Sequence, residues 1–279
     1  MTEVLFPENI GEAVSLLADH EDARPISGGA TLVAMRNAGL VEVSHLVSLD
    51  RIAGLSGIEV LDDGHIRIGA LTKHAETAAC AALTGSLEVL RMAAGKIANR
   101  VVRNMGTIGG SVANADPAAD YLPALACCDA VLTIVGPDGA RDVDILDYVT
   151  DWYETALEEG EIITAFTLPA PEPVASSYRK IARVTGDFAT ASCAMSLDAD
   201  GRGIRAAIGA CGPGPLRDHA AEAALRGHLG DPAAVSAFAK QLAEMADPVE
   251  DVRGSSEYRL SLIPRLITSV LDDLMKETV

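Results

Sequence analysis

The sequence predicts an α+β chain in two parts. Apolar patterns typical of strands and helices alternate over residues 1–168, and two further strands and three helices are expected after residue 174. Between the parts lies Pro169-Ala170-Pro171-Glu172-Pro173, whose three prolines exclude a helix and remove donors from any β-ladder. Because 279 residues with 49% hydrophobic side chains suffice for two cores, we place a domain boundary at this linker.

The first part is predicted to mix short helices and strands. Asn9 is a candidate N-cap with Glu12 at the capping-box position, and four apolar residues share the face of the helix that follows: Ile10, Ala13, Val14 and Leu17. Strands over 58–61 and 65–68 flank Asp62-Asp63-Gly64, which predicts a hairpin. We further expect a helix over 86–98, a strand over 130–135 that ends in a Pro137-Asp138-Gly139 turn, and an acidic helix over 152–159.

The second part is predicted to be a small sheet with helices. Two strands, 189–197 and 204–211, are rich in small residues, so a covering element can approach them closely. Helices are expected over 218–226, 232–246 and 255–276. Ser255 is the candidate N-cap of the last helix, whose buried stripe comprises Ile263, Leu266, Ile267, Val270, Leu271 and Leu274.

The charge of the chain disfavours two classes of partner. Forty acidic residues against twenty-two basic ones give a net charge of −18, which repels nucleic-acid phosphates and anionic membrane surfaces. The first residues form neither a basic n-region nor an apolar h-region, and no apolar run approaches about 18 residues. We therefore expect a cytoplasmic protein without direct membrane insertion that does not bind nucleic acid.

No metal site or catalytic group is predicted. The five cysteines are scattered without C-x-x-C spacing, and the six histidines show no paired-ligand pattern. Small buried thiols are the simplest interpretation of the cysteines, including the adjacent Cys127 and Cys128. Because no nucleophile or catalytic carboxylate pair stands out either, a cofactor must supply any redox chemistry, and metals belong to another chain.

Two loops with paired glycines are the most informative local feature. Gly109 and Gly110 lie in the stretch 103–120, and Gly28 and Gly29 lie in the stretch 24–31. Glycines that adopt positive φ let backbone amides approach a pyrophosphate, and Asp120 can accept hydrogen bonds from ribityl or ribose hydroxyls. The alternative is a tight turn between a helix and a strand. Neither loop fits the G-x-G-x-x-G or G-x-x-x-x-G-K-S/T patterns, which disfavours Rossmann and P-loop folds.

Four motifs, in order along the chain, carry a resemblance to a known family. Residues 107–120 match TIGGxxANADPAAD, and residues 178–189 match Y-x-K-x-x-R-x-x-G-D-F/Y/W-A. Residues 212–217 resemble G-P-T-P-L-R, and residues 251–259 resemble D-x-R-G-S-A-E-Y-R. On these motifs the chain resembles the FAD-binding medium subunit of molybdenum hydroxylases, the family of carbon monoxide dehydrogenase and xanthine dehydrogenase flavoprotein subunits.

The resemblance implies a fold and a cofactor. It implies a two-lobed FAD-binding fold of the vanillyl-alcohol oxidase type (PCMH-type) over 1–168, with lobes of about 1–55 and 56–168, and a smaller sheet-plus-helices C-terminal domain over 174–279. The FAD pyrophosphate would lie between the two glycine loops. The cofactor-binding residues implied in this way are Ser27, Gly28, Gly29, Ala30, Thr31, Leu32, Thr107, Ile108, Gly109, Gly110, Asn114, Asp116, Asp120 and Lys180.

Other motif residues leave alternatives open. Lys180 either lies near the flavin ring or is a surface lysine, and Phe188 either covers the isoalloxazine or is a core aromatic. Ile97 either contacts the adenine or belongs to the core. His74 follows Thr72, a candidate N-cap, and is interpreted as structural. Arg253 and Glu257 are interpreted as structural partners of the last helix, and residues 212–216 as a rigid bend.

By the same resemblance, the chain is an electron-transfer subunit. Substrate would be hydroxylated at a molybdopterin centre in a large subunit, and electrons would pass through 2Fe–2S clusters of a small subunit to this FAD and then to an external acceptor. The complex would be a dimer of heterotrimers. Ala30-Thr31 and Met35-Arg36-Asn37 depart from the carbon monoxide dehydrogenase type, which favours an N-heterocycle, purine or aldehyde as substrate. The alternatives are a carbon monoxide dehydrogenase subunit, a self-contained flavin oxidoreductase of the same fold, and an assembly module that has lost FAD.

Overall fold

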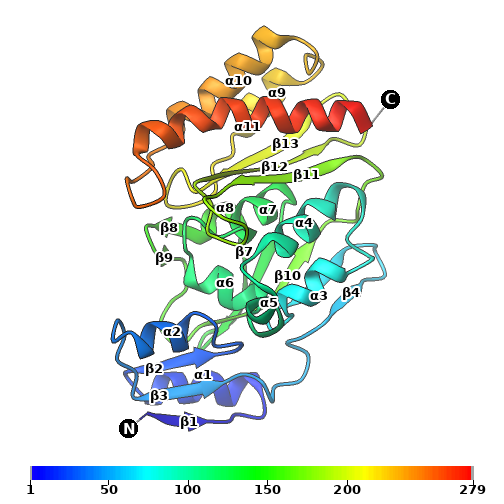
Figure 1. Ribbon diagram of the computed structural model, residues 1–279. Coiled ribbons are helices and arrows are strands. Elements are labelled where there is room, and N and C mark those ends of the chain that lie inside the picture. Colours follow the sequence, from blue (N-terminus) through cyan, green and yellow to red (C-terminus); the bar gives the residue numbers. More distant parts are fainter. Residues whose placement is uncertain (1, 278–279) are drawn as a thin grey trace.

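The computed structural model describes residues 2–277, and it begins with a small parallel sheet. The first lobe contains, in chain order, β1 (Glu3–Leu5), α1 (Ile10–Asp19), β2 (Ala23–Ile26), α2 (Leu32–Asn37) and β3 (His45–Ser48). Its strands are ordered β1-β3-β2, with both neighbours parallel to β3, and the lobe lies at the N-terminal end of the molecule (Figure 1). Asn9 caps α1 by accepting from the Glu12 amide at 2.9 Å, as the sequence predicts.

The second lobe is built on an antiparallel sheet with the order β4-β5-β10-β6-β7. The strands β4 (Ile58–Val60) and β5 (Ile66–Gly69) form the predicted hairpin. The remaining strands are β6 (Val131–Gly136), β7 (Gly139–Asp144) and β10 (Ile162–Leu168). Between β5 and β6 the chain forms α3 (His74–Ala79), a 3₁₀ turn (Gly85–Leu87), α4 (Glu88–Lys96), α5 (Arg100–Met105), α6 (Ile108–Asn114) and α7 (Tyr121–Cys127).

The acidic helix predicted over 152–159 is wrong. The helix of this region is α8 (Ile145–Tyr148), which Asp144 caps by accepting from the Leu146 amide at 2.8 Å. Residues 149–155 then form a two-stranded ribbon of β8 (Val149–Asp151) and β9 (Glu154–Thr155). The turn between these strands places Tyr153 at a φ of 58°, which a helix cannot contain. The acidic residues of this ribbon, Asp151 and Glu154, are exposed. An exposed helix surface has the same acidic composition, so composition alone led to the wrong prediction.

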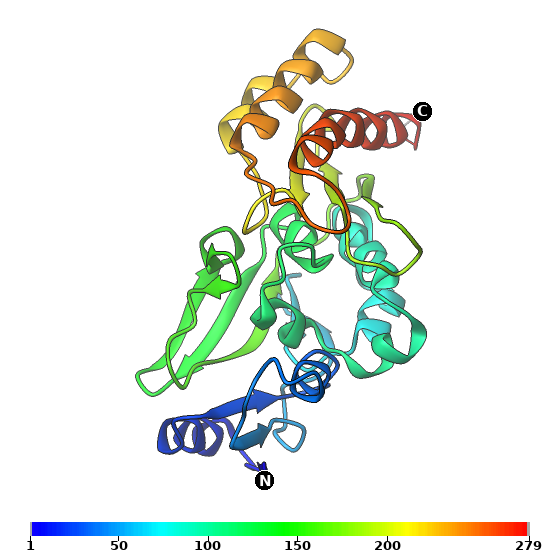
Figure 2. The ribbon, with the colours of Figure 1, turned by 60° about the vertical axis from the view of Figure 1, so that its left-hand side comes forward.

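The C-terminal part is a three-stranded antiparallel sheet under a layer of helices. Its strands, in spatial order, are β11 (Ser176–Ile181), β12 (Ala191–Leu197) and β13 (Ile204–Gly209). The helix α11 (Ser256–Glu277) covers one face of the sheet, and α9 (His219–Leu225) and α10 (Pro232–Met245) lie beside it (Figures 1 and 2). Ser255 accepts from the Tyr258 amide at 3.2 Å, and the predicted apolar stripe of α11 is buried.

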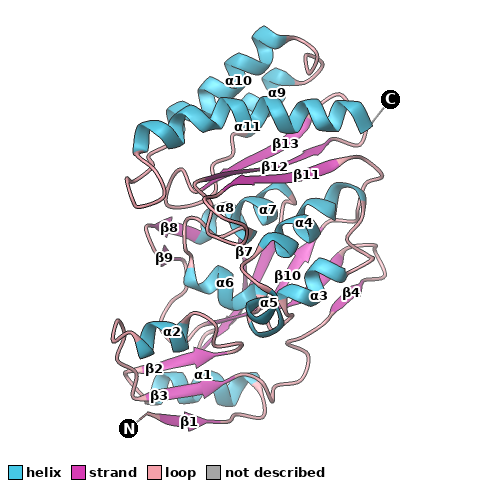
Figure 3. Cartoon of the chain, viewed as in Figure 1, coloured by secondary structure: helices cyan, strands magenta, loops and turns pink. Residues whose placement is uncertain are grey.

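The other face of this sheet packs on α4 and α7, so helices lie between the C-terminal sheet and the five-stranded sheet (Figure 3). The small residues of β12 and β13 allow this approach: Ala194 and Ala207 are fully buried in the core of the N-terminal part. A Cβ on Gly209 would lie 2.8 Å from Cγ of Pro123 in α7. No helix among residues 2–277 is long and apolar enough to cross a membrane.

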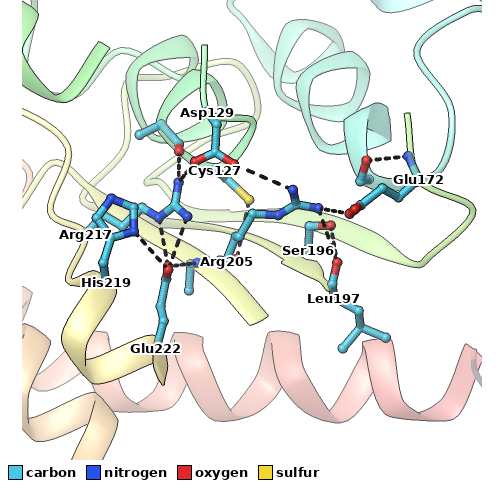
Figure 4. Close-up of polar contacts among 12 residues, drawn as sticks. Cys127, Asp129, Glu172, Ser196, Leu197, Arg205, Arg217, His219 and Glu222 are labelled. Carbon is cyan, nitrogen blue, oxygen red and sulfur yellow. Dashed lines mark hydrogen bonds and ion pairs between the residues drawn. The ribbon is translucent and has the colours of Figure 1, made fainter. Parts of the chain in front are cut away.

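Charged side chains also fasten the two parts together. Figure 4 shows Arg217, whose guanidinium donates to Glu222 at 2.8 Å and to Asp129 at 2.5 Å. Arg205 of β13 pairs with Glu172 of the proline linker at 2.6 Å and with Asp129 at 3.6 Å. Asp129, which follows α7, therefore pairs with two arginines of the C-terminal part, Arg205 and Arg217. The bend over 212–216 positions Arg217, since Leu216 pairs with Ile208 of β13 in a single bridge.

Candidate functional site

The structure brings the two glycine loops into contact. Ser27 Oγ lies 2.9 Å from Thr107 Oγ1, so the loops share a hydrogen bond. A Cβ on Gly28 would lie only 1.8 Å from the carbonyl oxygen of Met105, and one on Gly110 would lie 3.1 Å from Ser27 Oγ. Only glycine allows backbones to meet this closely. The close contact between loops 27–32 and 105–110 therefore requires glycine at positions 28 and 110.

The first loop has unused backbone donors. Gly29 adopts a φ of +67°, which turns the chain from β2 into α2. Within residues 2–277, the amides of Gly28, Gly29, Ala30 and Thr31 have no hydrogen-bond acceptor. Successive free amides after a left-handed residue form a concavity that suits an anion. Thr31 is exposed and Leu32 is half-buried, so the loop borders solvent.

The second loop differs from the prediction, because its two glycine amides already have acceptors within the protein. Gly109 and Gly110 lie in the first turn of α6 and neither adopts positive φ. The amide of Gly109 donates to the Ala70 carbonyl at 2.8 Å, and that of Gly110 to Thr107 Oγ1 at 3.1 Å. A Cβ on Gly109 would lie 2.6 Å from Ala70 Cβ, so this glycine is required for packing on the sheet. Ile108 is fully buried and anchors the same turn.

Asn114 and Asp116 end the stretch that begins with the second loop. α6 stops after Asn114, where Ala115 adopts a left-handed φ of 45°. Asp116 Oδ1 then accepts from the Ala118 amide at 2.9 Å, and its carboxylate is bonded by the Tyr153 side chain. Burial raises the pKa of Asp116 above its ordinary value, against the opposing effect of these hydrogen bonds. Both side chains are half-buried, at the edge of the loop region.

Asp120 has protein partners on both carboxylate oxygens. Tyr178 donates its hydroxyl to Oδ1 at 2.6 Å, and Lys180 Nζ lies 2.9 Å from the carboxylate. The side chains of Lys180 and Asp120 are 7% and 6% exposed, so Lys180 is not a surface lysine. Burial raises the pKa of Asp120, while the charge of Lys180 and the two hydrogen bonds oppose that shift. Tyr178 was missed from the sequence, although it opens the motif that contains Lys180.

His74 is structural, as expected, although Thr72 does not cap its helix. Its Nδ1 lies 3.1 Å from the Tyr121 hydroxyl, and burial lowers its pKa to about 4. The imidazole is therefore neutral near pH 7. Thr72 instead bonds the backbone of Gly57 from a fully buried position.

Two apolar candidates border the same region. Phe188 is 43% exposed, which excludes a core aromatic. Ile97 is half-buried, and its carbonyl accepts from Arg103 at 2.8 Å. Among the described residues, no three His, Cys, Asp or Glu side chains are grouped to hold a metal ion.

Comparison with known proteins decides the family. Residues 1–171 match the family described as FAD binding domain in molybdopterin dehydrogenase. The chain belongs to this family of FAD-binding subunits. Residues 176–274 of the flavoprotein subunit match a second family, described as CO dehydrogenase flavoprotein C-terminal domain. The resemblance that the four sequence motifs indicate is thereby confirmed.

Relatives of this flavoprotein subunit align over almost its whole length. The carbon monoxide dehydrogenase medium chain of Afipia carboxidovorans is 36% identical over 262 residues, 92% of this chain and 90% of that one. The xanthine dehydrogenase FAD-binding subunit of Escherichia coli is 30% identical, covering 95% and 92% of the two chains. A solved carbon monoxide dehydrogenase from Hydrogenophaga pseudoflava superposes with a TM-score of 0.93 at 33% identity, over 99% of this chain and 97% of that one. These matches confirm the predicted fold.

Proposed function

We propose that this chain holds FAD beside the contact between the two glycine loops. The observation that carries the proposal is the run of free amides at Gly28, Gly29, Ala30 and Thr31, opposite a second loop whose two glycine amides are satisfied. The first loop would bind the pyrophosphate, because unused donors and a positive-φ glycine suit an anion. Ser27, Thr107 and Gly110 would fix the spacing between the loops.

The other predicted contacts have two kinds of role in this proposal. Asn114 has a half-buried side chain with no partner among the described residues, and it remains a direct contact candidate. Leu32, Ile108 and Gly109 would position the loops through packing. Asp120 and Lys180 would act as a buried pair, and their mutual ion pair sets the orientation of both side chains. We retain the division into a FAD-binding domain over 1–168, with lobes of about 1–55 and 56–168, and a C-terminal domain over 174–279.

We infer that the chain works as the electron-transfer subunit of a molybdenum-dependent hydroxylase. When bound, FAD accepts two electrons and passes them to an external acceptor. The chain itself would bind and orient the cofactor, while a large molybdopterin subunit and a small iron–sulfur subunit carry the other centres. A dimer of heterotrimers in the cytoplasm is the assembly that the family resemblance supports.

The substrate is proposed to be an N-heterocycle, a purine or an aldehyde. The departure of the first loop at Ala30-Thr31 from the carbon monoxide dehydrogenase type supports this choice. The 36% identity to a carbon monoxide dehydrogenase medium chain favours the alternative, carbon monoxide. Co-purification of the native complex, assayed with carbon monoxide, purines, aldehydes and N-heterocycles, separates the two.

Cofactor binding is tested by titrating the full chain, freed of flavin, with FAD while the absorption and fluorescence of the flavin are followed. We expect saturable binding of one FAD per chain, and purified complexes that contain molybdenum and iron. A chain that binds no flavin would overturn the proposal and favour an assembly module. A stable flavoprotein that oxidises substrate without molybdenum or iron partners would favour a self-contained oxidoreductase.

A further inference from the structure

The motif over residues 251–259 forms a brace whose inner end is anchored in the core. Arg259 is 4% exposed and donates to the carbonyls of Thr190 at 2.7 Å and Ala210 at 3.1 Å. The same guanidinium donates to Asp251 Oδ1 at 2.5 Å. Asp251 is thereby fixed to the ends of β12 and β13, so the turn that contains it cannot move independently of the C-terminal sheet.

Arg253 extends the brace outward. Asp251 accepts from the Arg253 amide at 2.8 Å and from its guanidinium at 3.2 Å. The Arg253 guanidinium then pairs with Asp187 at 3.5 Å and lies over the ring of Phe188, 5.4 Å from the centroid. A guanidinium within about 6 Å of a ring centroid attracts the ring through a cation–π interaction. The interpretation of Arg253 as a partner of the last helix is therefore wrong, because its side chain contacts two carboxylates, Asp251 and Asp187, and the Phe188 ring.

The segment that Arg253 contacts approaches the FAD-binding part closely on its other side. Gly186 adopts a φ of +86°, and a Cβ there would lie 2.6 Å from the Ala98 carbonyl oxygen. Arg103, in the helix before the second glycine loop, donates to that carbonyl at 2.9 Å. Arg253 also attracts Asp116 electrostatically. The segment 186–188 thus lies between residue 98 and Arg253, next to the stretch proposed to bind the cofactor.

Phe188 lacks the burial that ordinarily orders an aromatic side chain. It is 43% exposed, so its position depends on a few directional contacts and not on a surrounding core. The Phe188 ring has Arg253 on one side, and the backbone amide of Phe188 donates to Asp187 Oδ1 at 2.8 Å. Removal of Arg253 would take a contact from both residues at once, since the guanidinium contacts the ring and the carboxylate, while Asp187 would keep its ion pair with Arg183 at 3.9 Å.

We infer that Arg253 is a positioning residue for the flavin site: through Asp187 and Phe188 it holds the Phe188 ring where bound FAD meets the C-terminal part. This inference rests on the proposed function. It gives the 251–259 motif a role in positioning. Arg259 and Asp251 attach the motif to the C-terminal sheet, and Arg253 contacts Asp187 and Phe188. The occupant is the flavin ring system, because the half-exposed Phe188 ring lies on a segment that approaches Ala98, beside the 103–120 stretch proposed to bind the cofactor.

The test compares Arg253→Met, Arg253→Lys, Phe188→Leu and the double variant Arg253→Met/Phe188→Leu in the full chain. Val252→Ala is the matched control, because Val252 lies in the same turn with its side chain 81% exposed. FAD affinity, the fluorescence of bound flavin and the melting temperature of the flavin-free chain are measured for each. The melting temperature separates a loss of folding from a loss of positioning.

We expect Arg253→Met to raise the Kd for FAD about tenfold, the effect of losing one ordering interaction. The fluorescence of its bound flavin should change, because displacement of the Phe188 ring exposes the flavin to a more polar environment. Phe188→Leu should reproduce both effects, the double variant should add little, and Arg253→Lys should recover part of the affinity. Val252→Ala should bind like the unchanged chain.

Two results would overturn the inference, and they are distinguishable. Failure of the unchanged chain to bind FAD overturns the proposed function and this inference with it. Normal binding by the unchanged chain, together with unaltered affinity and fluorescence in Arg253→Met, overturns the inference alone. Fully additive effects in the double variant do the same, because they show that Arg253 does not act through Phe188.

Discussion

The hydroxyl of Tyr178 donates a 2.6 Å hydrogen bond to the carboxylate of Asp120, which joins β11 of the C-terminal sheet to the end of the second glycine loop. Lys180, two residues further along the same strand, pairs with the same carboxylate at 2.9 Å. Residues i and i+2 of a strand face the same side, so the Y-x-K spacing lets both side chains reach one acceptor. The stretch proposed to bind FAD is thus connected to the C-terminal part by a buried ion pair.

We expect removal of either partner of Asp120 to destabilise the chain. Tyr178→Phe removes one of its hydrogen bonds, which costs about 1–3 kcal/mol, whereas Lys180→Met leaves a buried charge unpaired and costs about 3–5 kcal/mol. The double variant Asp120→Asn/Lys180→Met should lose less than the sum of its single variants. Urea unfolding measures these differences. Tyr258→Phe is the control, since Tyr258 is 45% exposed, and an equal effect there would contradict the argument.

Gly28→Ala should abolish FAD binding, because the new Cβ would lie 1.8 Å from the Met105 carbonyl and force the glycine loops apart. Gly39→Ala is a matched control: Gly39 has a φ of +70° but no atom within 4 Å of the added Cβ. It should lose only about 1–2 kcal/mol of stability from backbone strain and retain FAD affinity. Flavin titration and urea unfolding of both variants check this. Similar loss of FAD affinity in the two variants would mean that loop contact is not the cause.

His74 should make stability depend on pH below neutrality. Burial lowers its pKa from 6.5 to about 4 in the folded chain, so the unfolded chain binds more protons between these values. Its contribution is fully present above pH 6.5 and is lost as the pH falls towards 4, by about 3 kcal/mol in total. The free energy of unfolding of the unchanged chain should therefore fall more steeply than that of His74→Gln over this range. Parallel curves would show that His74 does not titrate in this way.

Arg217→Met should strongly destabilise the folded chain, because Arg217 is a buried charged residue. The Arg217 side chain is 3% exposed, and its loss would leave the buried Glu222 without its cation. We expect a loss of about 3–5 kcal/mol in the free energy of unfolding. Arg226→Met is the control, because Arg226 also pairs with two carboxylates, Asp198 and Asp200, but is 45% exposed. Its loss should be about 0–1 kcal/mol, and equal losses would contradict the role of burial.

Local patterns in the sequence predicted most elements correctly, and the exceptions have physical causes. Apolar periodicity located α1, the β4–β5 hairpin, β6 and α11, because burial of one face is a property of spacing. It failed over 152–159, where a positive φ at Tyr153 closes a strand ribbon. A residue other than glycine in that conformation carries no sequence signal, since the surrounding structure imposes it.

The sequence by itself determined which residues form the glycine loops and the motifs, and hence the family, because these are identities and spacings along the chain. Only the tertiary structure decided which of these residues have backbone amides or side chains without a hydrogen-bond partner inside the protein. Gly109 appears equivalent to Gly28 in sequence, yet its amide donates to Ala70, while the amide of Gly28 has no acceptor among residues 2–277. Asp120 likewise finds its partners about sixty residues away on β11. Such partners depend on how distant strands pack, which no local pattern records.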